Sequence, residues 1–152
     1  MQKEIPATMT YENYIKGKIV DFVAEEAYTS GGVEPMLAVA QVLANRVAAG
    51  WQGGDWLRVI RTAADHRGTI QPPLQVDPRD GNFRELLRRI DEIYHGIADD
   101  SAVNVETEEG KQRSLFYAEL HNINREWFIE HITDEPSSHP RLATVGQLTF
   151  FG

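Results

Sequence analysis

Glu26 is the residue of this 152-residue chain whose position most clearly suggests chemistry. Ile15, Ile19 and Phe22 precede it at spacings of three or four residues, so a helix places all four side chains on one apolar face. Burial there and the negative end of the helix dipole both disfavour an ionised carboxylate. A carboxylic acid that stays protonated near neutral pH can donate a proton, so Glu26 is a candidate general acid.

A structural interpretation of Glu26 competes with the chemical one. The helix is expected to end close to this residue, and a glutamate at a helix boundary often simply reaches solvent. Glu25 falls on the opposite face and is expected to face water. The helical pattern alone leaves both interpretations of Glu26 open, so other features of the chain must separate them.

The elements that position Glu26 follow from hydrophobic periodicity and from glycine and proline stops. The predicted helices cover about residues 11–28, 34–50, 56–64 and 82–97. A proline-rich irregular segment over residues 66–81 is a candidate wall of a cleft. The sequence therefore predicts a mainly helical core with one long connecting segment near its middle.

The remaining elements are short. They are predicted as a solvated acidic loop at residues 99–109, a strand at 114–118, a helical turn at 126–129 and a terminal hairpin at 142–151. The fold class is therefore predicted as α+β and mainly α, with a flexible lead-in over residues 1–10 and a single domain over residues 11–152.

Composition excludes several function classes. The chain has no cysteine, so disulfides, thiolate metal sites and thiol nucleophiles are unavailable. His121 and His131 lack the spacing of a zinc pair, and no phosphate-binding glycine loop or serine elbow is present, so we expect no metal and no cofactor. A net charge of −8 argues against nucleic acid as a partner. We also expect no membrane span and no signal peptide.

Polar and aromatic side chains suggest what the chain binds. Gln41, Asn45 and Arg46 resemble the exposed face of a DNA-reading helix, but the lysines needed for phosphate contacts are missing. Asn45 is instead expected to hold helix to helix. Sugar rings stack on exposed aromatic faces, although each of these aromatics is also a candidate core or rim residue. The aromatic candidates are Trp51, Trp56, Tyr117 and Trp127.

Taken in order, a set of short motifs resembles the bacterial cell-wall hydrolases that degrade spore cortex, a branch of the lysozyme-like superfamily also found in phage lysins. The pieces span about residues 15 to 151, and the glutamate followed by Asn45-Arg46-Val47 is the most specific of them. The matched pieces are Ala24-Glu25-Glu26-Ala27, Glu34, Val39 to Val47, Val59-Ile60, Ser114 to Tyr117, Trp127, and Ala143 to Gln147 with Phe150.

The resemblance implies a lysozyme-like helical core and a catalytic acid at the glutamate that precedes alanine, which is Glu26 here. Tyr117 is a candidate substrate contact because it lies in the matched Phe-Tyr strand. Gln71 and Trp127 are candidates because of their expected loop positions. The chain also departs from the family pattern, which has a histidine and a tyrosine in the closing segment and a tyrosine or histidine after the Phe-Tyr pair. The residues at these positions are Leu148, Phe151 and Ala118.

The implied reaction is cleavage of the β-1,4 bond between N-acetylmuramic acid and N-acetylglucosamine in peptidoglycan. A hydrolase needs a second carboxylate, for which Asp65, Asp77 and Asp80 are candidates. A lytic transglycosylase needs only one acid, and the resemblance favours this route. The alternative is a non-catalytic phage structural or wall-binding protein with the same fold. We expect a monomer made in the cytoplasm that acts on the wall after release or as part of a phage virion.

Overall fold

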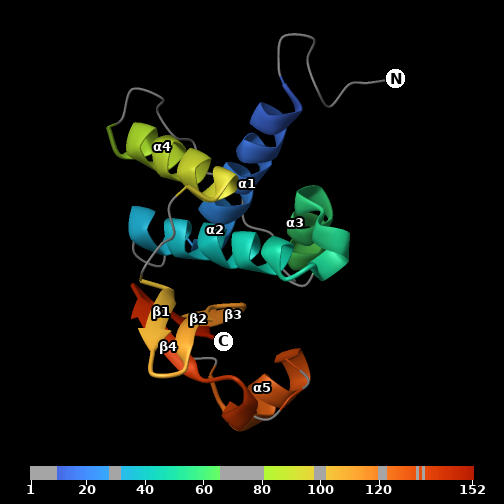
Figure 1. The fold of residues 1–152 in the computed structure, drawn as a ribbon, viewed down its shortest axis with the longest axis vertical. Helices are drawn as coiled ribbons and strands as arrows, with labels where there is room; N and C mark the ends of the chain where they lie inside the picture. Colours follow the sequence, from blue (N-terminus) through green and yellow to red (C-terminus); the bar gives the residue numbers. More distant parts are fainter. Residues whose placement is uncertain are drawn as a thin grey trace.

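The computed structural model describes residues 10–27, 32–65, 81–97, 102–119, 123–132, 134 and 136–152. Four longer helices form its upper part in Figure 1, and the strands and one short helix lie below them. The longer helices are α1 (Tyr11–Ala27), α2 (Val33–Ala48), α3 (Trp56–Asp65) and α4 (Gly81–His95). The helices predicted from periodicity are therefore present, with ends that differ from the prediction by at most two residues. The predicted lead-in, apart from Thr10, and the irregular segment over residues 66–80 lie outside the described residues.

Helix α2 is the centre of the core. It contacts α1, α3 and α4 as well as the strands, and Figure 1 shows it between the other helices and the strands. Every residue from Pro35 to Leu43 is buried, including the polar Gln41. A helix that is apolar on all sides is stable only when other elements cover all of its faces. Gly50, whose φ of 86° suits glycine, ends the α2 segment and leads into the short helix η2 (Trp51–Gly54).

The strands form two small antiparallel sheets. In the first, β1 (Asn104–Thr107) pairs with β2 (Gly110–Arg113). The prediction of a solvated loop over residues 99–109 is therefore wrong for β1. Its one acidic residue, Glu106, is exposed, whereas Asn104, Val105 and Thr107 are buried or partly buried, and the acidic residues on either side of this short strand obscured it in the sequence.

The second sheet has the order β3-β5-β4. Strand β3 (Phe116–Glu119) pairs with β5 (Leu148–Phe151), and β4 (Arg141–Val145) pairs with the other edge of β5. The predicted terminal hairpin is thus confirmed, and the predicted strand at residues 114–118 is present as β3. The central strand β5 is buried along its whole length, because helices or loops cover both faces of the sheet.

Alternation along β5 divides the apolar residues into two clusters. Leu148 and Phe150 pack into the main core with the helices, whereas Phe151 packs against Phe128 and Ile132 of helix α5 (Arg125–Ile132). The fold is therefore α+β and mainly α, as predicted. In the described ranges, no helix combines the length and apolar character needed to cross a membrane.

A buried amide group connects α2 to the strands. The Asn45 side-chain nitrogen donates to the Asn104 side-chain oxygen and to the Ser114 carbonyl oxygen, each at 2.8 Å. The Asn45 oxygen accepts a hydrogen bond of 3.1 Å from Gln41. Asn45 therefore has a structural role, but it joins a helix to the segment that leads into β3 rather than a helix to a helix. This contact fixes the start of the strand that carries Tyr117.

Candidate active site

Glu26 and Tyr117 form the candidate active site. Glu26 lies in the last turn of α1, and the Tyr117 hydroxyl of β3 donates a hydrogen bond to its Oε1 atom at 2.5 Å. Both side chains are partly buried. Strand alternation turns Tyr117 toward the main core, where its ring lies 5.9 Å from the ring of Phe150. Two residues selected separately from the sequence are thus in direct contact across 91 positions of the chain.

Arg46 is a third member of this site, and its role was missed in the sequence. It was expected on an exposed helical face, but its guanidinium carbon lies 4.8 Å from the ring centre of Trp51 and 5.9 Å from that of Phe116. Its Nε donates to the Leu115 carbonyl oxygen at 2.9 Å. Burial lowers the pKa of Arg46, and its electrostatic interactions with Tyr117 and Glu26 act in the opposite direction. The available signal was that Arg46 is the one Lys or Arg residue of α2, and that it follows the buried run that ends at Leu43.

The surroundings of Glu26 act on its charge in two opposing ways. Partial burial disfavours the carboxylate, as the helical pattern suggested. The hydrogen bond from Tyr117 and the positive charge of Arg46 stabilise the carboxylate. Glu25 is partly buried like Glu26, so the expected contrast between a core-facing and a water-facing glutamate is wrong. Contact with Tyr117, rather than burial alone, distinguishes Glu26.

A second carboxylate lies on the strand that carries Tyr117. Glu119 is two residues beyond Tyr117 in β3, so both side chains point to the same face of the sheet. Glu119 is partly buried. Of the aspartates considered from the sequence, Asp65 is the last residue of α3, whereas Asp77 and Asp80 lie outside the described residues. Glu119 is therefore the described carboxylate whose variant best tests whether Glu26 acts alone.

Trp127 is the other candidate substrate contact that the structure describes, and its ring contacts are with residues of α5 rather than with Glu26. Trp127 lies in α5, where its ring stacks on His131 at 4.7 Å and meets Phe128 at 6.2 Å. It packs against the small cluster beneath the sheet. Gln71 lies outside the described residues. Among the aromatic candidates, Trp51 lies beside the site through Arg46, whereas Trp56 packs against Tyr94 with ring centres 5.5 Å apart.

The three residues that depart from the family pattern are buried in the structure. Leu148, Phe151 and Ala118 are each less than one-tenth exposed. Ala118 lies opposite Thr149 in the β3–β5 pairing, and Leu148 lies opposite Glu119. Leu148 belongs to the main core and Phe151 to the small cluster, and none of the three apolar side chains offers a hydrogen bond to a ligand.

One described group of side chains has the atoms to bind a metal ion. Glu12 of α1 and Asp91 and His95 of α4 place candidate ligand atoms within 4.8 Å of one another. However, Lys16 Nζ lies 2.6 Å from Asp91 and 3.5 Å from Glu12, and His95 Nε2 lies 2.5 Å from Glu12. The group is thus an ion-pair network that joins α1 to α4.

This network predicts a pH dependence of stability. The hydrogen bond to Glu12 raises the pKa of His95 above its ordinary value of 6.5, and the Asp91 backbone carbonyl adds to the effect. The protonated histidine therefore stabilises the fold fully below about pH 6.5, and this contribution is lost as pH rises through the higher pKa of the folded state. The thermal midpoint of the wild type is expected to exceed that of His95→Gln at about pH 6, and the gap is expected to close near pH 9.

His131→Gln is the matched control, because the His131 ring bonds a backbone carbonyl of α5 rather than a carboxylate. A gap between the wild type and His95→Gln that stays constant over this pH range would contradict the assigned ion pair.

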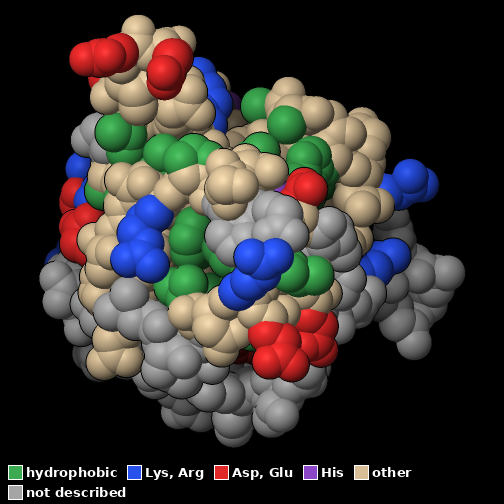
Figure 2. All heavy atoms as spheres, turned by 90° about the horizontal axis from the view of Figure 1, so that it is seen from below, with side chains coloured by type: hydrophobic (Ala, Val, Ile, Leu, Met, Phe, Trp, Pro, Cys, Tyr) green, Lys and Arg blue, Asp and Glu red, His purple; other side chains and the backbone are tan. Residues whose placement is uncertain are grey.

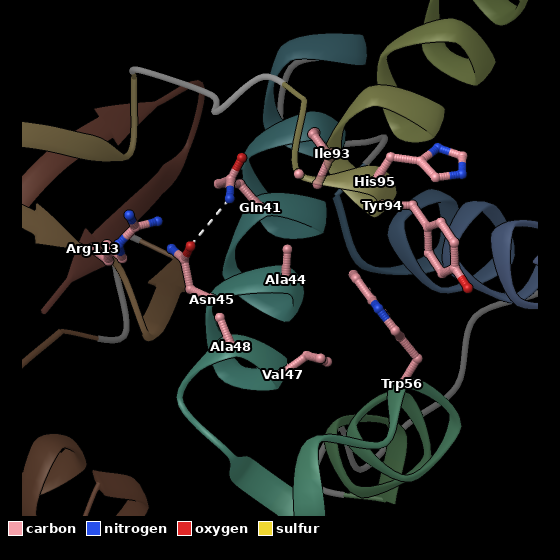
Figure 3. Close-up of a pocket in the computed structure, with 11 residues that line it drawn as sticks. Gln41, Ala44, Asn45, Val47, Ala48, Trp56, Ile93, Tyr94, His95 and Arg113 are labelled. Carbon is pink, nitrogen blue, oxygen red and sulfur yellow. Dashed lines mark hydrogen bonds between the residues drawn. The ribbon is translucent and has the colours of Figure 1, made fainter.

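A shallow pocket of about 240 Å³ lies over α2, and Figure 3 shows its lining residues. The small Ala44 and Ala48 line it together with Trp56 and Tyr94, while Gln41, Asn45 and Arg113 lie toward the strands. The polar lining residues include Asn45, whose amide group joins α2 to the strands. Because neither Glu26 nor Tyr117 lines the pocket, it is separate from the candidate active site.

The surface seen from below in Figure 2 carries Lys, Arg, Asp and Glu side chains scattered between apolar groups, with no continuous basic patch among the coloured residues.

Comparisons of the chain with protein-family models, curated proteins and solved structures find no significant match. Glu26 and its contact with Tyr117 are therefore the features of the chain that bear on its function.

Proposed function

We propose that this protein is a peptidoglycan-degrading enzyme that cleaves the β-1,4 bond between N-acetylmuramic acid and N-acetylglucosamine. The observation that carries the proposal is the 2.5 Å hydrogen bond from Tyr117 to Glu26, which joins two of the motifs behind the family resemblance. The mainly helical core and the small strand element are consistent with the lysozyme-like fold that this resemblance implies. Peptidoglycan glycan strands are the proposed partner.

Glu26 is proposed to act as the single acid of a lytic transglycosylase. It donates its proton to the bridging oxygen while the bond from that oxygen to the muramyl anomeric carbon breaks, and the bonding electrons stay on the oxygen. The muramyl 6-hydroxyl then attacks the anomeric carbon and returns its proton to the Glu26 carboxylate. The Tyr117 hydroxyl is suited to hold the carboxylate in place during both transfers.

The competing route is hydrolysis, in which a second carboxylate activates water. The geometry of β3 makes Glu119 the described residue that would serve this route. If Glu26 acts alone, Glu119→Gln keeps the products unchanged and Glu26 remains the indispensable acid.

A non-catalytic wall-binding protein is the second candidate function. The observation that favours it is the burial of Leu148, Phe151 and Ala118 at positions where the family pattern has polar side chains. A zymogram with peptidoglycan in the gel separates the two functions. An enzyme clears the gel, whereas a binder sediments with peptidoglycan and leaves it intact. Sedimentation without clearing would contradict the proposed enzyme.

Tyr117→Phe tests the contact between the two residues of the site. The variant keeps the ring but loses the hydroxyl that donates to Glu26, and a hydrogen bond to a charged group contributes about 1.5–3 kcal/mol. We therefore expect the rate of wall lysis, measured as loss of turbidity, to fall roughly ten- to hundredfold.

Tyr14→Phe is the control for this variant, because Tyr14 lies earlier in α1 and its ring is covered by Lys18 at 5.4 Å. Equal lysis by Tyr117→Phe and wild type would show that the Tyr117 hydroxyl has no part in the reaction.

A further inference from the structure

The guanidinium group of Arg46 is held in a fixed position beside two aromatic rings. Its Nε donates to the Leu115 carbonyl oxygen at 2.9 Å, and its central carbon lies 4.8 Å from the ring centre of Trp51 and 5.9 Å from that of Phe116. A guanidinium group that contacts aromatic faces and bonds through Nε has lost most of its freedom before any ligand binds. The protein therefore sets the orientation of the two terminal nitrogens, Nη1 and Nη2.

The terminal nitrogens of Arg46 have no acceptor within the part of the chain that the structure describes. In that part, Nε is the donor of Arg46 that is hydrogen-bonded, and no carboxylate lies within ion-pair distance of the guanidinium group. Neither terminal nitrogen is a buried atom without a partner, so both reach solvent. Arg88 and Arg89 of α4 differ, because they donate to Glu92 at 2.7 Å and to Glu34 at 3.1 Å.

The position of this charge is costly without an anion. Burial lowers the pKa of Arg46, and the net direction shows that its interactions with Tyr117 and Glu26 offset only part of the cost. Charges withdrawn from water are usually paired and hydrogen-bonded for this reason. Two donors in a fixed fork match the two oxygens of a carboxylate. The arrangement therefore fits a carboxylate that comes from outside the protein.

Arg46 is anchored next to the strand that carries Tyr117. The Leu115 carbonyl that accepts its hydrogen bond precedes Tyr117 by two residues, which is roughly 7 Å along an extended chain. The chain has a net charge of −8, and Glu26 and Glu119 lie on the elements that form the candidate active site. These charges repel an anionic substrate, so a fixed cation is the group that can hold one there.

We propose that Arg46 binds a carboxylate carried by the muramyl residue of the substrate through its two terminal nitrogens. The inference rests on the proposed function, in which the substrate is peptidoglycan. The lactyl group of a muramyl residue ends in a carboxylate or is extended by a peptide stem with carboxylates of its own, and both sources offer the same chemical group. N-acetylglucosamine has no such group. The contact therefore distinguishes the two sugars and determines which of the two glycosidic bonds is placed for cleavage.

The test measures the binding of soluble fragments by NMR. The charged probe is N-acetylglucosaminyl-N-acetylmuramyl tetrapeptide, which lacks the bond that the enzyme is proposed to cleave. The neutral probe is the same fragment with every carboxylate converted to a methylamide. The indole N–H signal of Trp51, assigned by its loss in Trp51→Phe, reports binding beside Arg46. We expect the wild type to bind the charged probe roughly tenfold or more tightly than the neutral probe.

The disaccharide without a peptide stem identifies the source of the carboxylate, because its lactyl carboxylate is free. Binding as tight as that of the charged probe supports the lactyl group. Binding about tenfold weaker supports a carboxylate of the stem.

Variants of Arg46 locate the discrimination between the probes. Arg46→Gln removes the charge and the fork, so it is expected to bind the charged and neutral probes with equal affinity. Arg46→Lys keeps the charge without the two-pronged geometry and is expected to retain only part of the discrimination. Arg58→Gln is the matched control, because Arg58 is an exposed arginine of α3, and it is expected to discriminate as the wild type does. The comparison of the two probes on the wild type needs no variant to fold.

The outcomes separate this inference from the proposed function, because the binding measurement needs no turnover. Equal binding of both probes by the wild type, or no binding of either, overturns the inference, as does full discrimination by a folded Arg46→Gln. If the wild type discriminates between the probes but releases no fragments from intact peptidoglycan, the proposed enzyme fails and the carboxylate site stands. Release of fragments by a wild type that binds both probes equally overturns the inference alone.

Discussion

Glu26→Gln is expected to lower the rate of wall lysis by on the order of 10²- to 10⁴-fold, the usual contribution of a general acid. The amide has nearly the shape of the carboxyl group and still accepts the hydrogen bond from Tyr117, but it has no proton to give. Removal of a partly buried acid is expected to leave the thermal midpoint unchanged or raise it. Turbidity loss of a cell-wall suspension and thermal unfolding measure the two effects on the same samples.

Glu25→Gln is the matched control for this experiment. Glu25 precedes Glu26 on α1 and is likewise partly buried, so the substitution removes the same charge from the same turn. The control is expected to retain most of the lytic activity. Rapid clearing by Glu26→Gln would remove Glu26 from the reaction and with it the proposed mechanism.

The largest expected effect on stability belongs to Asn45→Ala. The substitution breaks the hydrogen bonds that join α2 to Asn104 and to the Ser114 carbonyl, and it leaves Gln41 without its acceptor on Asn45. A buried polar group that loses its partner costs about 1–3 kcal/mol, so the free energy of unfolding is expected to fall by about 3 kcal/mol. Urea denaturation followed by circular dichroism measures this loss.

Asn13→Ala is the control, because Asn13 is an exposed asparagine within α1. It is expected to change stability by less than about 0.5 kcal/mol. A loss of similar size in both variants would show that the network around Asn45 has no special part in joining the helix to the strands.

Local patterns in the sequence predicted the elements that depend on local physics. Periodicity and glycine stops gave the extent of α2, where Gly50 adopts a backbone conformation that other residues disfavour. The turn at Gly146, with a φ of 59°, between β-prone segments gave the terminal hairpin. The strand β1 was missed, because it is only four residues long and lies within a highly acidic stretch of the sequence.

The contacts that define the site could not be predicted from such local patterns. The hydrogen bond between Glu26 and Tyr117 joins residues 91 positions apart, and the hydrogen bond from Arg46 to the Leu115 carbonyl joins residues 69 positions apart. No local rule links residues at these separations, so only the three-dimensional arrangement could reveal these two contacts. For Trp127, an expected loop position suggested a substrate contact, whereas the structure has it within α5 and packed against the small cluster.

Mass spectrometry of the fragments released from purified peptidoglycan tests the central claim most directly. A lytic transglycosylase that uses Glu26 alone leaves muramyl residues with 1,6-anhydro ends, and Glu119→Gln is expected to give the same fragments. Reducing ends would show hydrolysis and require a second carboxylate. The predicted result is 1,6-anhydro fragments from the wild type and none from Glu26→Gln. Absence of glycan fragments from the wild type, or equal release by Glu26→Gln, would contradict the account.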